Sequence, residues 1–133
     1  MARKDKSSRM DNAPGYAVSG DVSRNLIEVR YWGHVTTAEV KAISEEVMDL
    51  LPKMRQGFTF LGDLSKLESM DLDCVPYITK IMDACNAAGI GTVVRIIPDP
   101  RKDIGFNILS IIHYRRGVRI RTFQNSEEAS RAM

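Results

Sequence analysis

The sequence predicts an α/β domain in which helices pack against a mixed, mostly parallel sheet that begins with a β-hairpin. Three observations support this fold class. Short β-rich runs alternate with helical patterns along most of the chain, which favours parallel strands joined by helices. Two of these runs come first without a helix between them, which indicates the hairpin. The 133 residues are 44% hydrophobic and 27% charged, a balance typical of one soluble globular domain.

The N-terminal part of the chain predicts an arm followed by the hairpin. Residues 1–14 mix basic, acidic and small polar side chains without an apolar period. We therefore expect a disordered basic arm there and a single domain over residues 15–133. The runs Tyr16–Ser19 and Leu26–Trp32 flank a turn-forming segment and predict the two antiparallel strands.

The first helix has a marked start and a marked end. Thr36 and Glu39 have the spacing of a capping box, in which each side chain accepts a hydrogen bond from a backbone N–H at the helix start. Pro52 ends the helix, because proline has no N–H and its ring clashes with the preceding turn. The short apolar run Phe58–Leu61 then predicts a central strand that is covered on both faces.

The second helix is expected to begin at Asp73 or Cys74 and to run to Ala88. Asp73 is its expected N-cap, which stabilises a helix by about 1 kcal/mol. Gly89 is its expected C-terminal stop. The run Gly91–Ile97 that follows is the clearest strand in the chain.

Three further elements are expected near the C-terminus. Apolar spacing predicts a third helix over about residues 104–116. The run Val118–Phe123 predicts a strand with arginines on its outer face. Asn125 or Ser126 can cap a last helical turn, Glu127–Ala132.

The segment between the central strand and the second helix is the expected functional surface. Lys66–Cys74 predicts an acidic loop that leads into a helix N-terminus, where backbone N–H groups and the positive end of the helix dipole meet. Exposed polar loops on a rigid scaffold often serve in recognition. The candidate partner-binding residues are Asp63, Ser65, Glu68, Ser69, Asp71, Leu72, Asp73 and Cys74.

Charge is distributed unevenly along the chain. Residues 20–88 carry seven basic and eleven acidic groups, a net charge of −4, whereas residues 89–124 carry seven and two, a net charge of +5. This pattern either steers a charged partner or is an ordinary solvated surface. We expect no nucleic-acid partner, because the arginines of the basic segment are hardly interleaved with stacking aromatics.

Several classes of site and location are not expected. No apolar run approaches the roughly 20 residues that cross a bilayer, so we expect a cytoplasmic protein without membrane contact. Cys74 and Cys85 would lie about 16 Å apart along one helix, too far for a disulfide. The sequence predicts no metal site and no cofactor. His34 is expected in an exposed turn, with a pairing to a loop aspartate or to Cys74 as the alternative.

Five stretches, taken in order, resemble the STAS domain, the domain of sulphate transporters and bacterial anti-sigma factor antagonists. The resemblance covers about residues 16–132, and the stretches are Gly33–Thr36, Phe60–Ser65, the acidic loop, Pro98–Arg101 and Asn125–Ala129. It implies a non-enzymatic regulatory module with an anti-sigma factor or a kinase-like regulator as its protein partner. In the anti-sigma factor antagonists, a kinase phosphorylates a Ser or Thr at the start of the second helix, which adds about two negative charges inside an interface.

The chain departs from the family pattern at the modified position. The strand-end Asp of the family falls on Asp63 and its following Ser on Ser65. The family segment Asp-Ser-Ser-Gly falls on residues 71–74, so that the phospho-acceptor position is Leu72, which has no hydroxyl. Asp73 beside it is either a fixed mimic of the phosphorylated state or the helix N-cap. Ser69 carries the nearest hydroxyl in the loop, but it lies three residues before the acceptor position, Leu72.

The residues and the resemblance together favour a non-catalytic interaction module that is not switched by phosphorylation at Leu72. The alternative is a small-ligand sensor with an anion or nucleotide at the helix N-termini, supported by Arg101 or Lys102. An enzyme that uses Cys74 as a nucleophile is a third class and would need a reactive thiol. Trp32 is a candidate homodimer contact if it faces outward.

Overall fold

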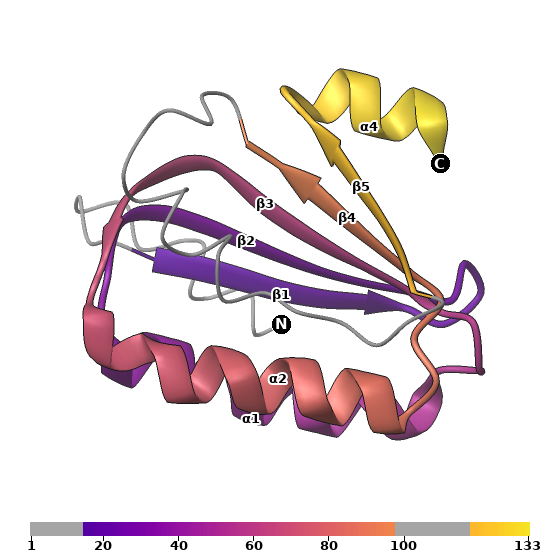
Figure 1. The fold of residues 1–133 in the computed structure, drawn as a ribbon, viewed down its shortest axis with the longest axis horizontal. Helices are drawn as coiled ribbons and strands as arrows, with labels where there is room; N and C mark the ends of the chain where they lie inside the picture. Colours follow the sequence, from indigo (N-terminus) through magenta and orange to yellow (C-terminus); the bar gives the residue numbers. More distant parts are fainter. Residues whose placement is uncertain (1–14, 98–117) are drawn as a thin grey trace.

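The structure is a computed structural model that describes residues 15–97 and 118–133, and its centre is a five-stranded sheet (Figure 1). The strands, in spatial order, are β1 Gly15–Asp21, β2 Leu26–Val35, β3 Thr59–Met70, β4 Thr92–Ile96 and β5 Arg119–Phe123. β1 and β2 are antiparallel, and the three other neighbouring pairs are parallel. The predicted mixed sheet with an N-terminal hairpin is therefore confirmed. The expected arm and the expected helix over 104–116 lie outside the described residues.

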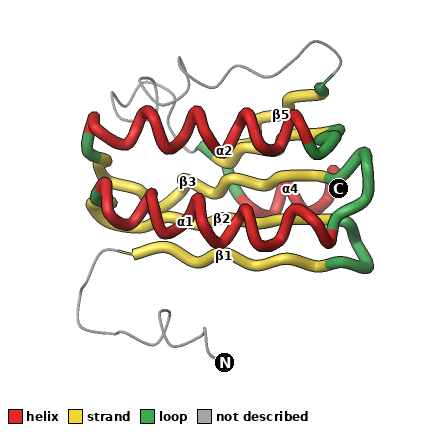
Figure 2. The backbone as a smooth tube through the Cα atoms, turned by 90° about the horizontal axis from the view of Figure 1, so that it is seen from below, coloured by secondary structure: helices red, strands yellow, loops and turns green. Residues whose placement is uncertain are grey.

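Helices lie against both faces of this sheet. α1 Thr37–Leu50 and α2 Val75–Ala87 lie side by side on one face, and the short α4 Ser126–Ala132 lies on the other (Figures 1 and 2). Two 3₁₀ turns, η2 Leu51–Lys53 and η3 Leu72–Cys74, follow α1 and precede α2. The sheet is therefore the middle layer of the domain, with α1 and α2 on one side and α4 on the other.

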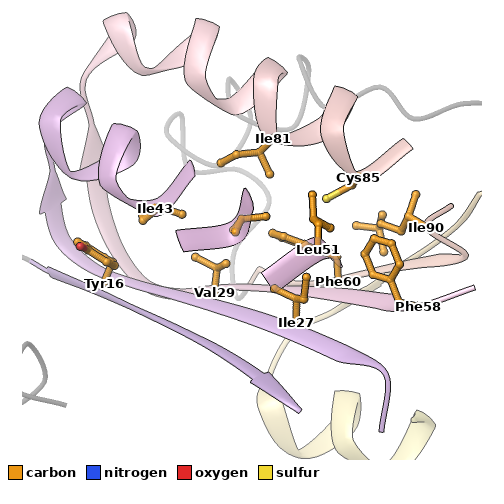
Figure 3. Packing of buried hydrophobic residues seen from close by; sticks show 12 residues of the cluster. Tyr16, Ile27, Val29, Ile43, Leu51, Phe58, Phe60, Ile81, Cys85 and Ile90 are labelled. Carbon is orange, nitrogen blue, oxygen red and sulfur yellow. The ribbon is translucent and has the colours of Figure 1, made fainter. Parts of the chain in front are cut away.

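The largest apolar cluster fills the space between the sheet and the helix pair. Figure 3 shows side chains of the strands, among them Ile27 and Val29, facing side chains of the helices, among them Ile43 and Ile81. Its fully or nearly fully buried members include Ile27, Val29, Ile43, Val47, Phe58, Phe60, Ile81 and Cys85. On the opposite face Leu61 belongs to a smaller cluster with Val94, Ile96 and Ala129 of α4. Because Phe60 and Leu61 are buried on opposite faces, the prediction of a central strand covered on both sides is confirmed.

The predicted helix boundaries of α1 are confirmed by their capping bonds. The hydroxyl of Thr36 accepts from the backbone N–H of Glu39 at 3.3 Å, and the carboxylate of Glu39 accepts from the backbone N–H of Thr36 at 2.9 Å. Pro52 lies in the 3₁₀ turn directly after the helix. Gly89 follows α2 with φ +90°, and a Cβ there would come within 2.9 Å of Gln56 Cγ. This position therefore requires glycine on both conformational and steric grounds.

Two of the expected boundaries are wrong, and both concern the candidate functional loop. β3 continues through residues 66–70, which were expected to form a loop, because this stretch pairs in parallel with the end of β2. Asp73 is not the N-cap of α2: it lies in η3, and Cys74 holds the cap position without a side-chain hydrogen bond. The 3₁₀ turn supplies the entry into α2 through the Cys74 N–H, which donates to the Asp71 carbonyl at 3.0 Å.

The side chain of Trp32 packs against the backbone of its own chain. A Cβ at Gly15 would come within 2.6 Å of its ring, so the indole lies directly over the backbone of β1. The side chain is half-buried as a result. Trp32 therefore stabilises the hairpin, and a homodimer through it stays a prediction.

Candidate functional site

The candidate functional surface lies where β2 and β3 end and α1 and α2 begin. In the parallel register His34 lies opposite Ser69, and Val35 lies opposite Met70. The backbone N–H of Asp71 donates to the Val35 carbonyl at 3.2 Å, which extends this pairing by one residue. The chain segments 34–37 and 69–74 therefore lie side by side, although they are 35 residues apart in sequence.

Asp71 joins the two segments through both oxygens of its carboxylate. Oδ1 lies 2.9 Å from His34 Nε2, and Oδ2 accepts from the backbone N–H of Thr37 at 3.2 Å. Thr37 is the first residue of α1, so the carboxylate lies against the positive end of that helix dipole. Asp71 thus satisfies a backbone donor that the helix cannot satisfy itself.

His34 connects Asp71 to Ser69. Because a carboxylate only accepts hydrogen bonds, His34 Nε2 donates to Asp71, and His34 Nδ1 pairs with the Ser69 hydroxyl. The side chain of His34 remains 47% exposed. His34 is exposed as expected, but it lies in β2 and not in a turn, and the alternative pairing with a loop aspartate is confirmed. We refer to the side chains of His34, Ser69 and Asp71 as the loop network.

Leu72 projects from the turn that this network holds. Its exposed fraction of 77% is the highest of the large hydrophobic side chains in the described residues. Asp73 and Glu68 are also exposed. The candidate residues Glu68, Ser69, Asp71, Leu72 and Asp73 therefore lie together at the end of β3, with an apolar side chain among polar ones.

Asp63 and Ser65 lie apart from this group. Ser65 precedes Asp71 by six positions, roughly 20 Å of extended strand. Asp63 Oδ1 accepts from the Ser65 backbone N–H at 2.9 Å and from its hydroxyl at 2.6 Å. Both side chains are thus used locally, at the point where the pairing between β2 and β3 shifts its register. Asp63 therefore has a structural role in which it holds the backbone of Ser65.

Cys74 is buried, with an exposed fraction of 1%. Burial raises the pKa of its thiol, the Asp71 and Asp73 charges act in the same direction, and the contact of Sγ with Thr37 Oγ1 at 3.9 Å opposes them only in part. The thiol is therefore protonated and shielded near neutral pH. This environment is the opposite of that of a nucleophilic cysteine.

We expect Cys74 and Cys85 to resist alkylation in the folded protein. Burial raises the pKa of Cys85 to about 12, so neither thiol supplies thiolate at pH 7.5. Iodoacetamide treatment followed by mass spectrometry should modify both cysteines only after urea is added. Rapid native labelling of Cys74 would contradict this and would reopen the enzyme hypothesis.

Residues 15–97 and 118–133 contain no group of three or more His, Cys, Asp and Glu side chains that could hold a metal ion. No helix there has the length and apolar character to cross a membrane.

Comparison with solved structures shows that the chain has the fold of anti-sigma factor antagonists. An uncharacterised SpoIIAA-like protein of the DUF3478 family from Shewanella loihica matches with a TM-score of 0.66 and 12% identity over 94% of this chain and 98% of its own. The unphosphorylated form of the anti-sigma factor antagonist SpoIIAA matches with a TM-score of 0.63 and 16% identity, over 89% of this chain and 96% of its own. The phosphorylated form of the Bacillus cell fate determinant SpoIIAA matches with a TM-score of 0.60 and 17% identity, over 90% of this chain and 100% of its own. No family model and no curated protein matches the sequence.

Proposed function

We propose that this chain is a non-catalytic regulatory module that binds a protein partner through the end of β3. The Leu72 surface, as we define it, comprises Glu68, Leu72, Asp73 and the loop network beside them. We further propose that the partner is an anti-sigma factor or a kinase-like regulator. Binding does not depend on phosphorylation at position 72, because leucine has no hydroxyl.

The exposure of Leu72 is the observation that carries this proposal. A leucine that is 77% exposed loses apolar contact with water when a partner covers it, and full burial of such a side chain contributes about 1.5–3 kcal/mol. The surrounding turn is already fixed by Asp71, so little ordering is needed on binding. An apolar side chain on a fixed polar loop has the character of an interface anchor.

The shared fold supports the class of partner. SpoIIAA is described as an anti-sigma factor antagonist and is known in phosphorylated and unphosphorylated forms. In the family pattern the phospho-acceptor falls on Leu72, the most exposed large apolar side chain of the described residues. The same position would then serve as a contact point in both cases, controlled by charge in the antagonists and permanently apolar in this chain.

The geometry favours a protein partner over an anion at the helix N-termini. The N-terminus of α1 already receives the carboxylate of Asp71, which takes the Thr37 N–H that an anion would use. Asp73 adds a further negative charge beside the start of α2. A bound anion would have to overcome both charges, and Arg101 and Lys102 lie outside the described residues.

Affinity capture from the native cell with paired variants tests this function. We expect wild-type protein to retain one partner and Leu72→Lys to retain at least about ten times less, since a loss of 1.5–3 kcal/mol weakens binding about 10- to 100-fold. Val22→Lys is the matched control, because Val22 is also an exposed apolar residue, 47% exposed, in the turn between β1 and β2. Equal recovery with wild type and Leu72→Lys, or loss with Val22→Lys alone, would contradict the proposal.

A further inference from the structure

A cavity lies at the opposite end of the strands from the Leu72 surface. It has a volume of about 420 Å³ and opens where β2 to β5 begin, beneath the C-terminal end of α4. Figure 1 shows α4 running back over β4 and β5 on the face away from α1 and α2. β3 alone has 12 residues, so roughly 35–40 Å separates this cavity from the turn at Leu72.

Strand register creates the floor of the cavity. Leu26, Thr59, Thr92 and Arg119 are consecutive partners across β2, β3, β4 and β5, so their side chains form one row on one face of the sheet. Two positions further along, Val94 and Arg121 are partners in a parallel second row. Two hydroxyls and two guanidinium groups therefore lie on a floor that Leu26 and Val94 make partly apolar.

A third guanidinium completes the lining from the hairpin turn. Arg24 borders the same cavity as Arg119 and Arg121. Arg121 is partly engaged, since Nη1 donates to the Ala132 carbonyl at 3.3 Å and the guanidinium lies 5.3 Å from the Phe123 ring centroid. Among the described residues, no side chain forms a hydrogen bond or ion pair with the guanidinium of Arg24 or Arg119.

Two acidic side chains lie near the cavity but outside its lining. Asp21 is close enough to Arg24 to feel its charge, but Oδ1 accepts from the Ser23 hydroxyl at 2.8 Å and from the Arg24 backbone N–H at 3.2 Å. Glu28, on the cavity face of β2, lies 3.7 Å from Arg30 Nε. The cavity lining therefore combines three guanidinium groups with no acidic side chain.

We propose that this cavity binds a small molecule that carries a phosphoryl group with at least two negative charges. Guanidinium groups match the geometry of phosphoryl oxygens through paired N–H donors, and threonine hydroxyls donate further hydrogen bonds. A volume of about 420 Å³ lies within the range of small-molecule pockets. The apolar floor at Leu26 and Val94 leaves room for a carbon-containing part of the ligand beside the charge.

This site is independent of the proposed function. It uses the amino ends of the strands, whereas the Leu72 surface uses the carboxyl ends of β2 and β3. A failure of partner binding would leave the cavity proposal standing, and the reverse also holds. The cavity also gives the uneven charge of the chain a definite location, because Arg119 and Arg121 belong to the basic segment 89–124.

Calorimetric titration with pyrophosphate and with ADP, at about 150 mM salt so that weak surface attraction is screened, tests the site. We expect saturable binding of at least one probe with a Kd below about 1 mM. Arg119→Gln and Arg24→Gln should each weaken that binding about tenfold or more, since each removes a charged hydrogen-bonding partner. Both arginines are exposed, so the variants should fold normally.

Arg30→Gln is the matched control, because Arg30 is an exposed arginine of β2 outside the cavity lining. It should leave the Kd unchanged. The proposal would be overturned by the absence of saturable binding of both probes to the wild type. It would also be overturned if Arg30→Gln weakened binding as much as Arg119→Gln, because the attraction would then be general rather than local.

Discussion

Replacing Phe58 with alanine is expected to lower the free energy of unfolding by about 3–5 kcal/mol. The ring is completely buried between the sheet and the helix pair, and Figure 3 shows it beside Ile90 at the end of the largest cluster. Removal of the ring loses the favourable free energy of its transfer from water to the core. It also leaves a cavity that the packed neighbours cannot fill. Since a domain is typically stable by about 5–15 kcal/mol, this single change removes a large share of the total.

Urea unfolding followed by circular dichroism measures this effect. Val22→Ala serves as its control, because that side chain is 47% exposed and its truncation should change stability by no more than about 0.5 kcal/mol. A loss below about 1 kcal/mol for Phe58→Ala would show that the cluster is not packed as described. A midpoint shift without a change of slope would indicate a simple loss of stability.

Replacing Asp71 with alanine is the second change with a large expected effect. It should lower the free energy of unfolding by about 1–2 kcal/mol. The change removes the bonds of the carboxylate to His34 at 2.9 Å and to the Thr37 N–H at 3.2 Å, and it leaves the start of α1 without one of its acceptors. The side chain is 42% exposed, so solvent screens part of the interaction and holds the effect to this range. Asp71→Asn should cost less, because the amide oxygen can still accept from Thr37.

Asp73→Ala is the matched control for Asp71→Ala. It removes the same side chain two positions along the same turn, where the carboxylate is exposed and holds no capping bond. Urea unfolding should therefore show a clear loss for the first variant and a change within about 0.5 kcal/mol for the second. Equal losses would contradict the assignment of Asp71 as the residue that fixes the turn. Because the turn positions Leu72, Asp71→Ala should also weaken partner binding, while Asp73→Ala should retain the fixed loop.

The sequence was sufficient for the parts of the fold that depend on local chemistry. The capping box of Thr36 and Glu39 and the stop at Gly89 each involve residues close together in sequence, and the structure confirms them. The hairpin and the buried central strand follow from hydrophobic pattern, which is also a local signal. These elements could be predicted because each is defined by residues that lie close together in sequence.

The candidate site depended on pairing between distant segments, which pattern alone does not reveal. Lys66, Glu68 and Ser69 have little β-propensity, yet they extend β3 because the end of β2 offers a parallel partner. The same pairing brings His34 to Ser69 and Asp71, and it makes Asp71, not Asp73, the aspartate that accepts from a backbone N–H at a helix start. The pairing of His34 with a loop aspartate was open as an alternative, but the particular aspartate required the register.

The cavity at the amino ends of the strands shows the same limit. Arg119 and Arg121 were expected on the outer face of their strand, and Arg24 belonged only to a turn. Their convergence depends on the register across four strands and on the position of α4. A charge count located a basic segment, but only the sheet brings Arg119 and Arg121 to the same cavity as Arg24.

Site-specific photocrosslinking in the native cell tests the central claim most directly. A photoreactive phenylalanine analogue placed at position 72 should yield one discrete covalent complex with a protein partner, because Leu72 is the proposed anchor of the interface. The same analogue at position 22, in the turn between β1 and β2, should yield no such complex. The absence of a complex from position 72 in folded protein, or the same set of adducts from both positions, would contradict partner binding through the Leu72 surface.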